Sequence, residues 1–210
     1  MPSSSYHFST EWDLVGTARE VSDVLADPLD LPRWWPSVYL AVAELEPGGQ
    51  GGVGRRVMAL TKGFLPYTLS WSFQVVESRH PRGFTLEAAG DFVGRGVWTF
   101  EERGAFVHVT YDWRIDARRP FLRLLSPVAR PIFAANHRWA MRKGLESLEL
   151  ELARRRASSD LERALVPAPP RPTSTSSVPL VLAAAGVAGA VLGAAHLIVK
   201  ATRPRRRLWR

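Results

Sequence analysis

The stretch FVHVTYDWRID, from Phe106 to Asp116, decides the fold, because apolar and polar side chains alternate along its whole length. Successive side chains of a β-strand point to opposite faces of a sheet. One face of this stretch therefore carries only apolar side chains, those of Val107, Val109, Tyr111, Trp113 and Ile115. The opposite face carries His108, Thr110, Asp112 and Arg114. This alternation predicts a strand with one face in the core and the other in solvent.

Five similar runs precede this strand, and short turns rich in glycine or proline separate them. The runs are Ser37–Glu46, Gly54–Thr61, Tyr67–Glu77, Phe84–Ala89 and Gly94–Glu102. Six runs joined in this way predict an antiparallel meander. By the same alternation its inner face is apolar and aromatic, with Trp71, Phe73 and Trp98 among the inward side chains. Most ionisable groups are then expected to point to solvent.

A seventh strand and two short helices are predicted ahead of the meander. The side chains of Tyr6–Val15 alternate in the same way, which is typical of a half-buried strand. Thr17 and Glu20 follow with the spacing of a capping box, so a short helix should begin there. Two prolines then restrict the chain to a second short helix or a turn, which ends at Trp34 and Trp35.

The last predicted element of the domain is a long helix from about Ile132 to Arg156. Its apolar residues recur at helical spacing and form one stripe, made of Met141, Leu145, Leu148 and Leu152. A curved sheet cannot bury its apolar face alone, so this helix should lie across the sheet and leave a space between them. His137 precedes Met141 by four residues and should share its face. It is either a core histidine with a hydrogen-bond partner or a group that faces a ligand.

Several classes of site are disfavoured. The chain has no cysteine, which excludes disulfides, thiolate catalysis and cysteine zinc sites. No second histidine or carboxylate lies at metal-ligand spacing from His137, so we expect no metal site. The glycines of Gly48–Gly54 occupy a turn between strands, with no helix behind them to receive a phosphate. Since no carboxylate is predicted on the inner face, catalysis is disfavoured, and we expect no cofactor.

The net charge of +8 is distributed unevenly along the chain. From Val166 onward there are seven Lys and Arg residues and no Asp or Glu, whereas residues 1–165 hold 21 basic and 20 acidic side chains. Nucleic-acid binding requires a clustered basic face, and the nearly neutral domain offers none in its composition. We therefore expect no nucleic-acid partner.

The C-terminal part has the pattern of a membrane anchor. Val178–Val199 is a run of 22 residues without a formal charge, and as a helix it would span roughly 33 Å, more than a hydrocarbon core of about 30 Å. A Pro/Ser-rich linker, residues 158–177, precedes the run, and a basic tail, residues 200–210, follows it. A buried Ala-rich helix is the alternative. Gly189 and Gly193 form a GxxxG pattern, which would allow a homodimer.

The two signals for membrane orientation conflict. The basic tail should remain on the cytoplasmic side, which would place the domain outside. The N-terminal sequence MPSSSYHFSTEWDL, residues 1–14, lacks the basic-then-apolar pattern of a signal peptide. We therefore expect a single-pass protein of the cell membrane with its domain on the cytoplasmic side.

The domain, residues 6–157, resembles the START-like helix-grip superfamily (SRPBCC), which includes polyketide cyclase/dehydrase and lipid-transport proteins. The resemblance is carried by Ser9–Leu40, GRGVWTFEERG (94–104), VTYDWRID (109–116) and NHRWAMRKGLESL (136–148). It implies an α+β fold in which a curved antiparallel sheet of about seven strands wraps a long C-terminal helix. It also implies a deep apolar cavity that opens near the short helices, with Trp34 and Trp35 at or near its mouth. A packing role for one of these two tryptophans is the alternative.

Three functional hypotheses follow. The first is a membrane-tethered binding or transport protein for a hydrophobic small molecule, such as a lipid, a quinone or a polyketide-like compound. Its candidate ligand-binding residues are Trp34, Trp35, Trp71, Phe73, Trp98, Tyr111, Trp113, His137 and Met141. The second is an enzyme of the polyketide cyclase or aromatase type, in which Tyr111, His137 or an arginine assists proton transfer. The third is a dimerising or protein-contact module at the membrane.

Overall fold

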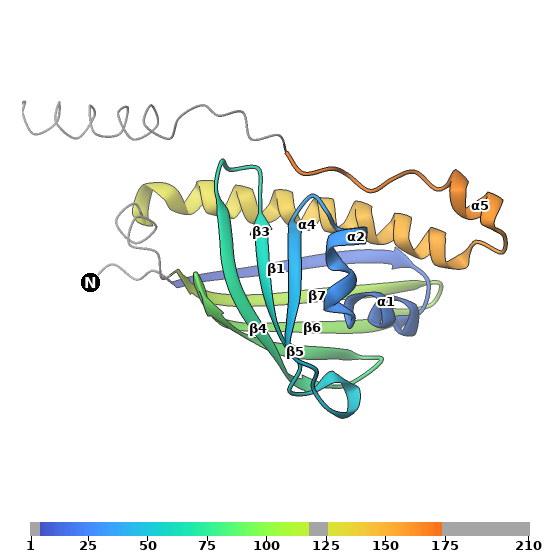
Figure 1. Cartoon of the computed structure of the whole chain (residues 1–210), viewed down its shortest axis with the longest axis horizontal. Coiled ribbons are helices and arrows are strands. Elements are labelled where there is room, and N and C mark those ends of the chain that lie inside the picture. The colour runs from blue at the N-terminus through green and yellow to red at the C-terminus, as the bar shows by residue number, and fades with distance from the viewer. Residues whose placement is uncertain (1–4, 118–125, 174–210) are drawn as a thin grey trace, which may run out of the picture. The chain divides into compact units, whose positions relative to one another are not determined.

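The computed structural model describes residues 5–117 and 126–173 of the chain (Figure 1). The strands are β1 (Ser5–Val15), β2 (Tyr39–Glu46), β3 (Arg56–Lys62), β4 (Thr68–Ser78), β5 (Gly83–Gly90), β6 (Phe92–Arg103) and β7 (Phe106–Ala117). The helices are α1 (Ala18–Leu25), α2 (Leu31–Trp34), α4 (Ser126–Arg156) and α5 (Asp160–Leu165), with short 3₁₀ helices η1 (Pro28–Asp30) and η2 (Gln50–Gly52).

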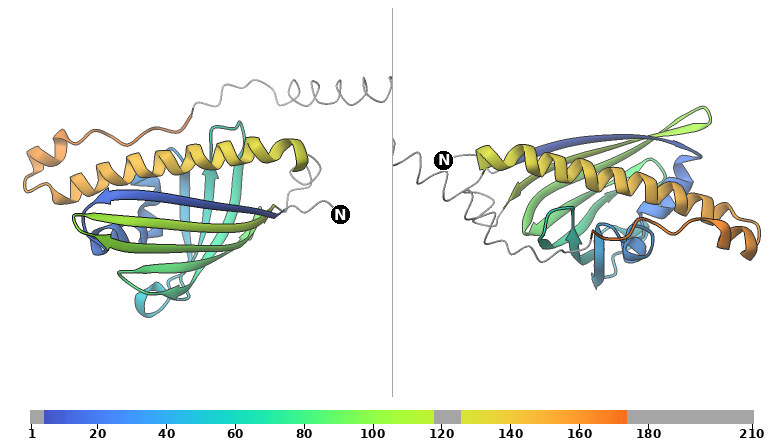
Figure 2. Two further views of the ribbon diagram at one scale, coloured as in Figure 1. Left: turned by 180° about the vertical axis from the view of Figure 1, so that it is seen from behind. Right: turned by 90° about the horizontal axis from the view of Figure 1, so that it is seen from above.

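The seven strands form one antiparallel sheet in the order β1-β7-β6-β5-β4-β3-β2. Strands β2 to β7 follow one another as a meander, as the sequence predicts. The first strand then pairs with the last, from Ser5 opposite Asp116 to Val15 opposite Phe106. Figures 1 and 2 show the sheet strongly curved, with α4 lying along its open side. The predicted helix-grip arrangement of a curved sheet and a long helix is confirmed.

The predicted inner and outer faces of β7 are confirmed. Tyr111, Trp113 and Ile115 are buried, whereas Arg114 is exposed. On the outer face, polar side chains pair across β1 and β7. His7 Nε2 lies 2.8 Å from a carboxylate oxygen of Asp112, and His108 Nδ1 lies 2.8 Å from one of Asp13 (all four on these two strands). The ionisable groups of β7 are therefore held away from the core.

The first short helix begins at the capping box that the sequence predicts. Thr17 caps α1 by accepting a hydrogen bond from the Glu20 backbone N–H, and the Glu20 carboxylate accepts one from the Thr17 N–H. Helix α2 is tied to α4 by Arg33, whose guanidinium donates to both carboxylate oxygens of Glu151 at 2.9 and 2.6 Å. Arg155 donates to the same carboxylate at 2.8 Å. Glu151 is only 2% exposed, so these bonds offset the cost of burying its charge.

Helix α4 packs its apolar stripe against the inner face of the sheet. Met141, Leu148 and Leu152 are buried, and Leu145 packs on the same core cluster. The helix begins at Ser126, ahead of the predicted start, and contains Pro131 near its N-terminal end. A proline in this part of a helix removes one backbone donor, which explains why the sequence pattern places the start after it.

Part of the predicted linker has defined structure. Within the predicted Pro/Ser-rich linker, residues 158–177, Asp160–Leu165 forms α5, capped by the Ser159 side chain, which accepts from the Glu162 N–H. The chain then runs back beside α4 (Figures 1 and 2), and Arg154 Nη2 donates to the Pro167 carbonyl at 2.7 Å. This return segment, Pro167–Thr173, ends at Lys62 and Gly63. The hydrogen bonds that hold this segment join side chains to backbone groups, and the pattern of apolar residues in a sequence does not predict such bonds.

The predicted membrane anchor lies outside the described residues. This applies to the run 178–199, the GxxxG at Gly189 and Gly193, and the basic tail 200–210. Within residues 5–117 and 126–173, no helix combines the length and the apolar character that a membrane span requires.

Candidate functional site

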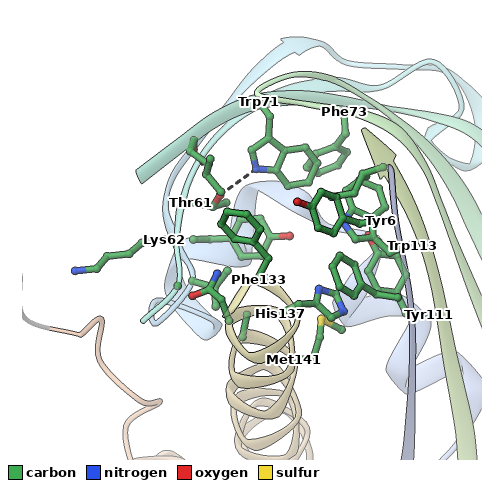
Figure 3. A pocket seen from close by; sticks show the side chains of 18 of the residues that line it. Tyr6, Thr61, Lys62, Trp71, Phe73, Tyr111, Trp113, Phe133, His137 and Met141 are labelled. Carbon is green, nitrogen blue, oxygen red and sulfur yellow. Dashed lines mark hydrogen bonds between the residues drawn. The ribbon is translucent and has the colours of Figure 1, made fainter. Parts of the chain in front are cut away.

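An apolar pocket lies between the inner face of the sheet and the N-terminal half of α4 (Figure 3). Its volume is about 160 Å³. Apolar cavities of roughly 150 Å³ admit benzene, so the interior takes a group about the size of one aromatic ring. A longer ligand would extend through the open side. The lining residues are Tyr6, Phe8, Trp35, Val38, Tyr39, Thr61, Lys62, Gly63, Tyr67, Leu69, Trp71, Phe73, Leu86, Trp98, Tyr111, Trp113, Ile115, Phe133, Asn136, His137, Ala140 and Met141.

Eight of the nine predicted site residues line this pocket. The sheet supplies Trp71, Phe73, Trp98, Tyr111 and Trp113, and α4 supplies His137 and Met141. The eighth is Trp35, which directly follows α2. Trp34 is the exception, because it is fully buried and is not among the lining residues.

The expected position of Trp34 and Trp35 at the mouth is wrong. Their side chains are 0% and 3% exposed, and the rings stack on each other with centroids 5.5 Å apart. Gly144 of α4 leaves room for Trp35, since a Cβ atom at this glycine would lie 2.3 Å from Cζ2 of the ring. The physical reason is that α2 is tied to the C-terminal half of α4 through Arg33 and Glu151, which buries both rings. The alternative of a packing role applies to Trp34.

Several lining residues are partly exposed, among them Tyr67, Phe133 and Asn136. We refer to these three residues, together with the buried Lys62 and Gly63 beside Asn136, as the pocket rim. The Asn136 side-chain oxygen accepts hydrogen bonds from the backbone N–H groups of the two residues after Gly63, at 3.0 and 3.4 Å. Thr173 adds to this edge, because its hydroxyl donates to the Gly63 carbonyl at 3.2 Å. The connection between β3 and β4 is thus fixed to α4 and to the return segment.

His137 combines both features that the sequence leaves open. It lines the pocket, and its Nε2 lies 3.2 Å from the Thr10 hydroxyl while its ring stacks on Phe8 at 4.3 Å. Burial away from water, together with the nearby Arg138, lowers its pKa to about 4. At neutral pH the imidazole is therefore uncharged, and it can donate or accept a hydrogen bond.

Two tyrosines supply further polar groups that stay uncharged. Burial raises the pKa of Tyr39 and of Tyr111, so both phenols remain protonated at neutral pH. Tyr111 stacks between Trp98 and Trp113, with centroids at 4.1 and 5.7 Å. The sequence did not single out Tyr39. Its place directly after the tryptophan turn, at the start of β2, was the available signal.

The charges around the pocket point away from its interior. Among the described lining residues Lys62 is the only one with a full charge, and none is a carboxylate. Figure 3 shows the Lys62 side chain running outward, and its Nζ donates to the Thr173 carbonyl at 2.5 Å. In the same figure Phe133, His137 and Met141 project from α4 toward the aromatic side chains of the sheet. The described residues contain no group of three or more His, Cys, Asp or Glu that could hold a metal ion.

The fold recurs in solved structures of low sequence identity. A protein from Thermus thermophilus superposes with a TM-score of 0.59 at 15% identity, over 72% of this chain and 100% of that one. The ZhuI aromatase/cyclase from Streptomyces sp. R1128 superposes with a TM-score of 0.58 at 17% identity, over 73% of this chain and 97% of its own. At such identities the likeness concerns the fold alone.

Comparison of the sequence with known proteins places the domain in a family. No curated protein matches the chain in sequence. The profile of one protein family matches residues 6–153, which include all strands and most of α4. The chain therefore belongs to the family described as polyketide cyclase / dehydrase and lipid transport, within the START-like helix-grip superfamily.

Proposed function

We propose that the protein binds a hydrophobic small molecule in this pocket and holds it next to a membrane. One observation carries the proposal: the pocket interior is built from aromatic and aliphatic side chains, and its polar groups are uncharged. Affinity would come from apolar burial, worth about 25 cal/mol for each Å² removed from water. The Tyr39 and Tyr111 hydroxyls and the His137 ring would orient the ligand.

The membrane part of the proposal is supported by the sequence beyond Thr173. The uncharged run 178–199 has the length of a transmembrane helix, and the basic tail suits lipid headgroups. We propose a single-pass protein with its domain on the cytoplasmic side. A tether of this kind would raise the effective concentration of apolar ligands, which partition into the bilayer.

The test is extraction of the purified domain, residues 1–173, with organic solvent, followed by mass spectrometry. Ala140→Phe and Ala153→Phe form a matched pair on α4, because Ala140 lines the pocket and Ala153 is exposed outside it. We expect an apolar compound to remain with the wild type and with Ala153→Phe, and to be lost from Ala140→Phe. Recovery of the same compounds from both variants, or of none from the wild type, would contradict the proposal.

A second candidate function is catalysis of the cyclase type. It is favoured by one observation, namely that His137 and Tyr111 both face the same pocket. In this case a poly-β-ketone would bind in the pocket while one of the two moves a proton. His137→Gln and Tyr111→Phe should then retain a bound substrate and lose its turnover. Loss of binding without a separable chemical step would favour the binding protein.

A further inference from the structure

We propose that the pocket rim docks against the surface of a lipid bilayer, so that the pocket opens toward the membrane. The inference rests on the proposed membrane tether and adds an orientation to it. It commits to one partner for this surface, a bilayer that contains anionic lipid.

The first step is the path of the chain after α4. Helix α4 ends at Arg156, far from the rim, and the return segment brings the chain back. Thr173 is held at the rim by two hydrogen bonds, from Lys62 Nζ to its carbonyl at 2.5 Å and from its own hydroxyl to the Gly63 carbonyl at 3.2 Å. Because Lys62 and Gly63 line the pocket, the chain leaves the described domain at the edge of the pocket.

The second step is the length of the tether. Four residues, 174–177, separate Thr173 from Val178, where the uncharged run begins. A fully extended chain advances at most about 3.6 Å per residue, so Val178 lies within roughly 18 Å of Thr173. Phe106 lies nine residues along β7 from the pocket residue Ile115, or about 30 Å at the usual rise of a strand. The four-residue connection would keep a membrane-embedded run 178–199 close to Thr173, and hence close to the rim that Thr173 contacts.

The third step is the chemistry of the surface beside the rim. Phe64 and Ile132, next in sequence to the rim residues Gly63 and Phe133, are 40% and 46% exposed. Apolar side chains of this kind are stabilised at the interface of a bilayer. Arg138 and Arg142 of α4 are exposed basic side chains, which complement anionic headgroups. The surface thus combines apolar contacts with positive charge.

The functional meaning is a direct route for the ligand. A rim that touches the bilayer would let an apolar molecule pass between the membrane and the pocket without crossing water. The uncharged polar groups of the pocket, those of Tyr39, Tyr111 and His137, would then bind the end of the molecule that enters first.

The test uses the full chain, which contains no native cysteine. Single variants Phe64→Cys and Phe106→Cys are labelled with an environment-sensitive fluorophore and reconstituted into phosphatidylcholine/phosphatidylglycerol vesicles that contain a spin-labelled quencher lipid. The two positions are matched, because both are phenylalanines and are 40% and 48% exposed. We expect the label at 64 to be quenched several-fold more strongly than the label at 106.

A third variant tests the anchor itself. A long Gly/Ser spacer inserted after Thr173 should preserve recovery of the protein with the vesicles and reduce quenching at 64 toward the level at 106. Unchanged quenching with the spacer would overturn the positioning role of Thr173.

The outcomes separate the two proposals. If the full chain is not recovered with vesicles, the proposed tether fails and the orientation fails with it. If it is recovered but the label at 64 is quenched no more than the label at 106, only the orientation is overturned.

Discussion

At the scale of single residues, Gly144, the position opposite Trp35, decides the shape of the pocket beside that ring. Gly144→Ala would normally favour a helix by about 1 kcal/mol. Here the new methyl group would meet the Trp35 ring at 2.3 Å, so we expect a net loss of about 1–3 kcal/mol in the free energy of unfolding. Urea denaturation followed by tryptophan fluorescence would measure it. The exposed Ala153 gives the control, since Ala153→Gly changes helix propensity alone. A more stable Gly144→Ala variant would show that Trp35 moves freely.

His137 should make stability depend on pH. Its pKa is about 4 in the folded protein, against an ordinary value of 6.5. Between these values the unfolded chain binds a proton that the folded chain does not, so the stabilisation present above pH 6.5 is lost as the pH falls toward 4. Relative to His137→Gln, the wild type should lose up to about 3 kcal/mol over this window, the equivalent of the shift. Urea denaturation of both proteins at several pH values is the measurement, and parallel curves would contradict the prediction.

The tryptophan pair marks the limit of prediction from single residues. Alternation along the strands was enough to place Trp71, Trp98 and Trp113 on the inner face, because the period of a strand assigns every residue to a side. Trp34 ends the four-residue helix α2 and Trp35 follows it, and an element this short has no usable period. One of them lines the pocket and the other is core, since only Trp35 projects past Gly144 toward the cavity.

At the scale of elements, the attachment of α2 to α4 depends on Glu151. Burial alone would raise the pKa of this carboxyl, but hydrogen bonds from Arg33 and Arg155 outweigh it and hold the pKa below its usual value. Glu151→Gln should therefore cost about 2–4 kcal/mol in the free energy of unfolding at neutral pH.

The same helix offers the matched control. Glu146 forms an ion pair with Lys143 on the exposed side of α4, and Glu146→Gln should cost less than about 0.5 kcal/mol. Equal losses in the two variants, measured by urea denaturation at pH 7, would show that the buried ion pair does not hold α2. The stabilisation that Glu151 provides should also be lost as the pH falls low enough to protonate its carboxyl group.

Periodic elements were predictable and the return segment was not. Strands and helices repeat an apolar pattern, so β1 to β7 and α4 could be located to within a few residues. The return segment is proline-rich and contributes no such pattern. It is placed by backbone groups that bond to side chains more than 100 residues away, such as Thr173 to Lys62.

At the scale of the whole molecule, the distribution of charge separates two modes of membrane binding. Residues 1–165 are nearly neutral, so the domain alone should adhere to anionic vesicles only through salt-sensitive contacts. We expect the full chain to float with vesicles at high salt and to be released only by detergent, whereas residues 1–173 should remain in the aqueous fraction. Flotation on a density gradient would decide this. Salt extraction of the full chain would show that 178–199 does not span the bilayer.

The pairing of β1 with β7 has a consequence for how the chain acquires its structure during synthesis. Contacts between neighbouring strands of the meander close over short loops, but β1 must wait until residues 106–117 have emerged, about a hundred positions later. Until then the aromatic inner face of the sheet is not fully covered and stays accessible to other chains. Helix α4, which also lines the cavity, is synthesised after β7, so the cavity is completed last. We expect chaperones or other chains to contact the nascent protein in that interval.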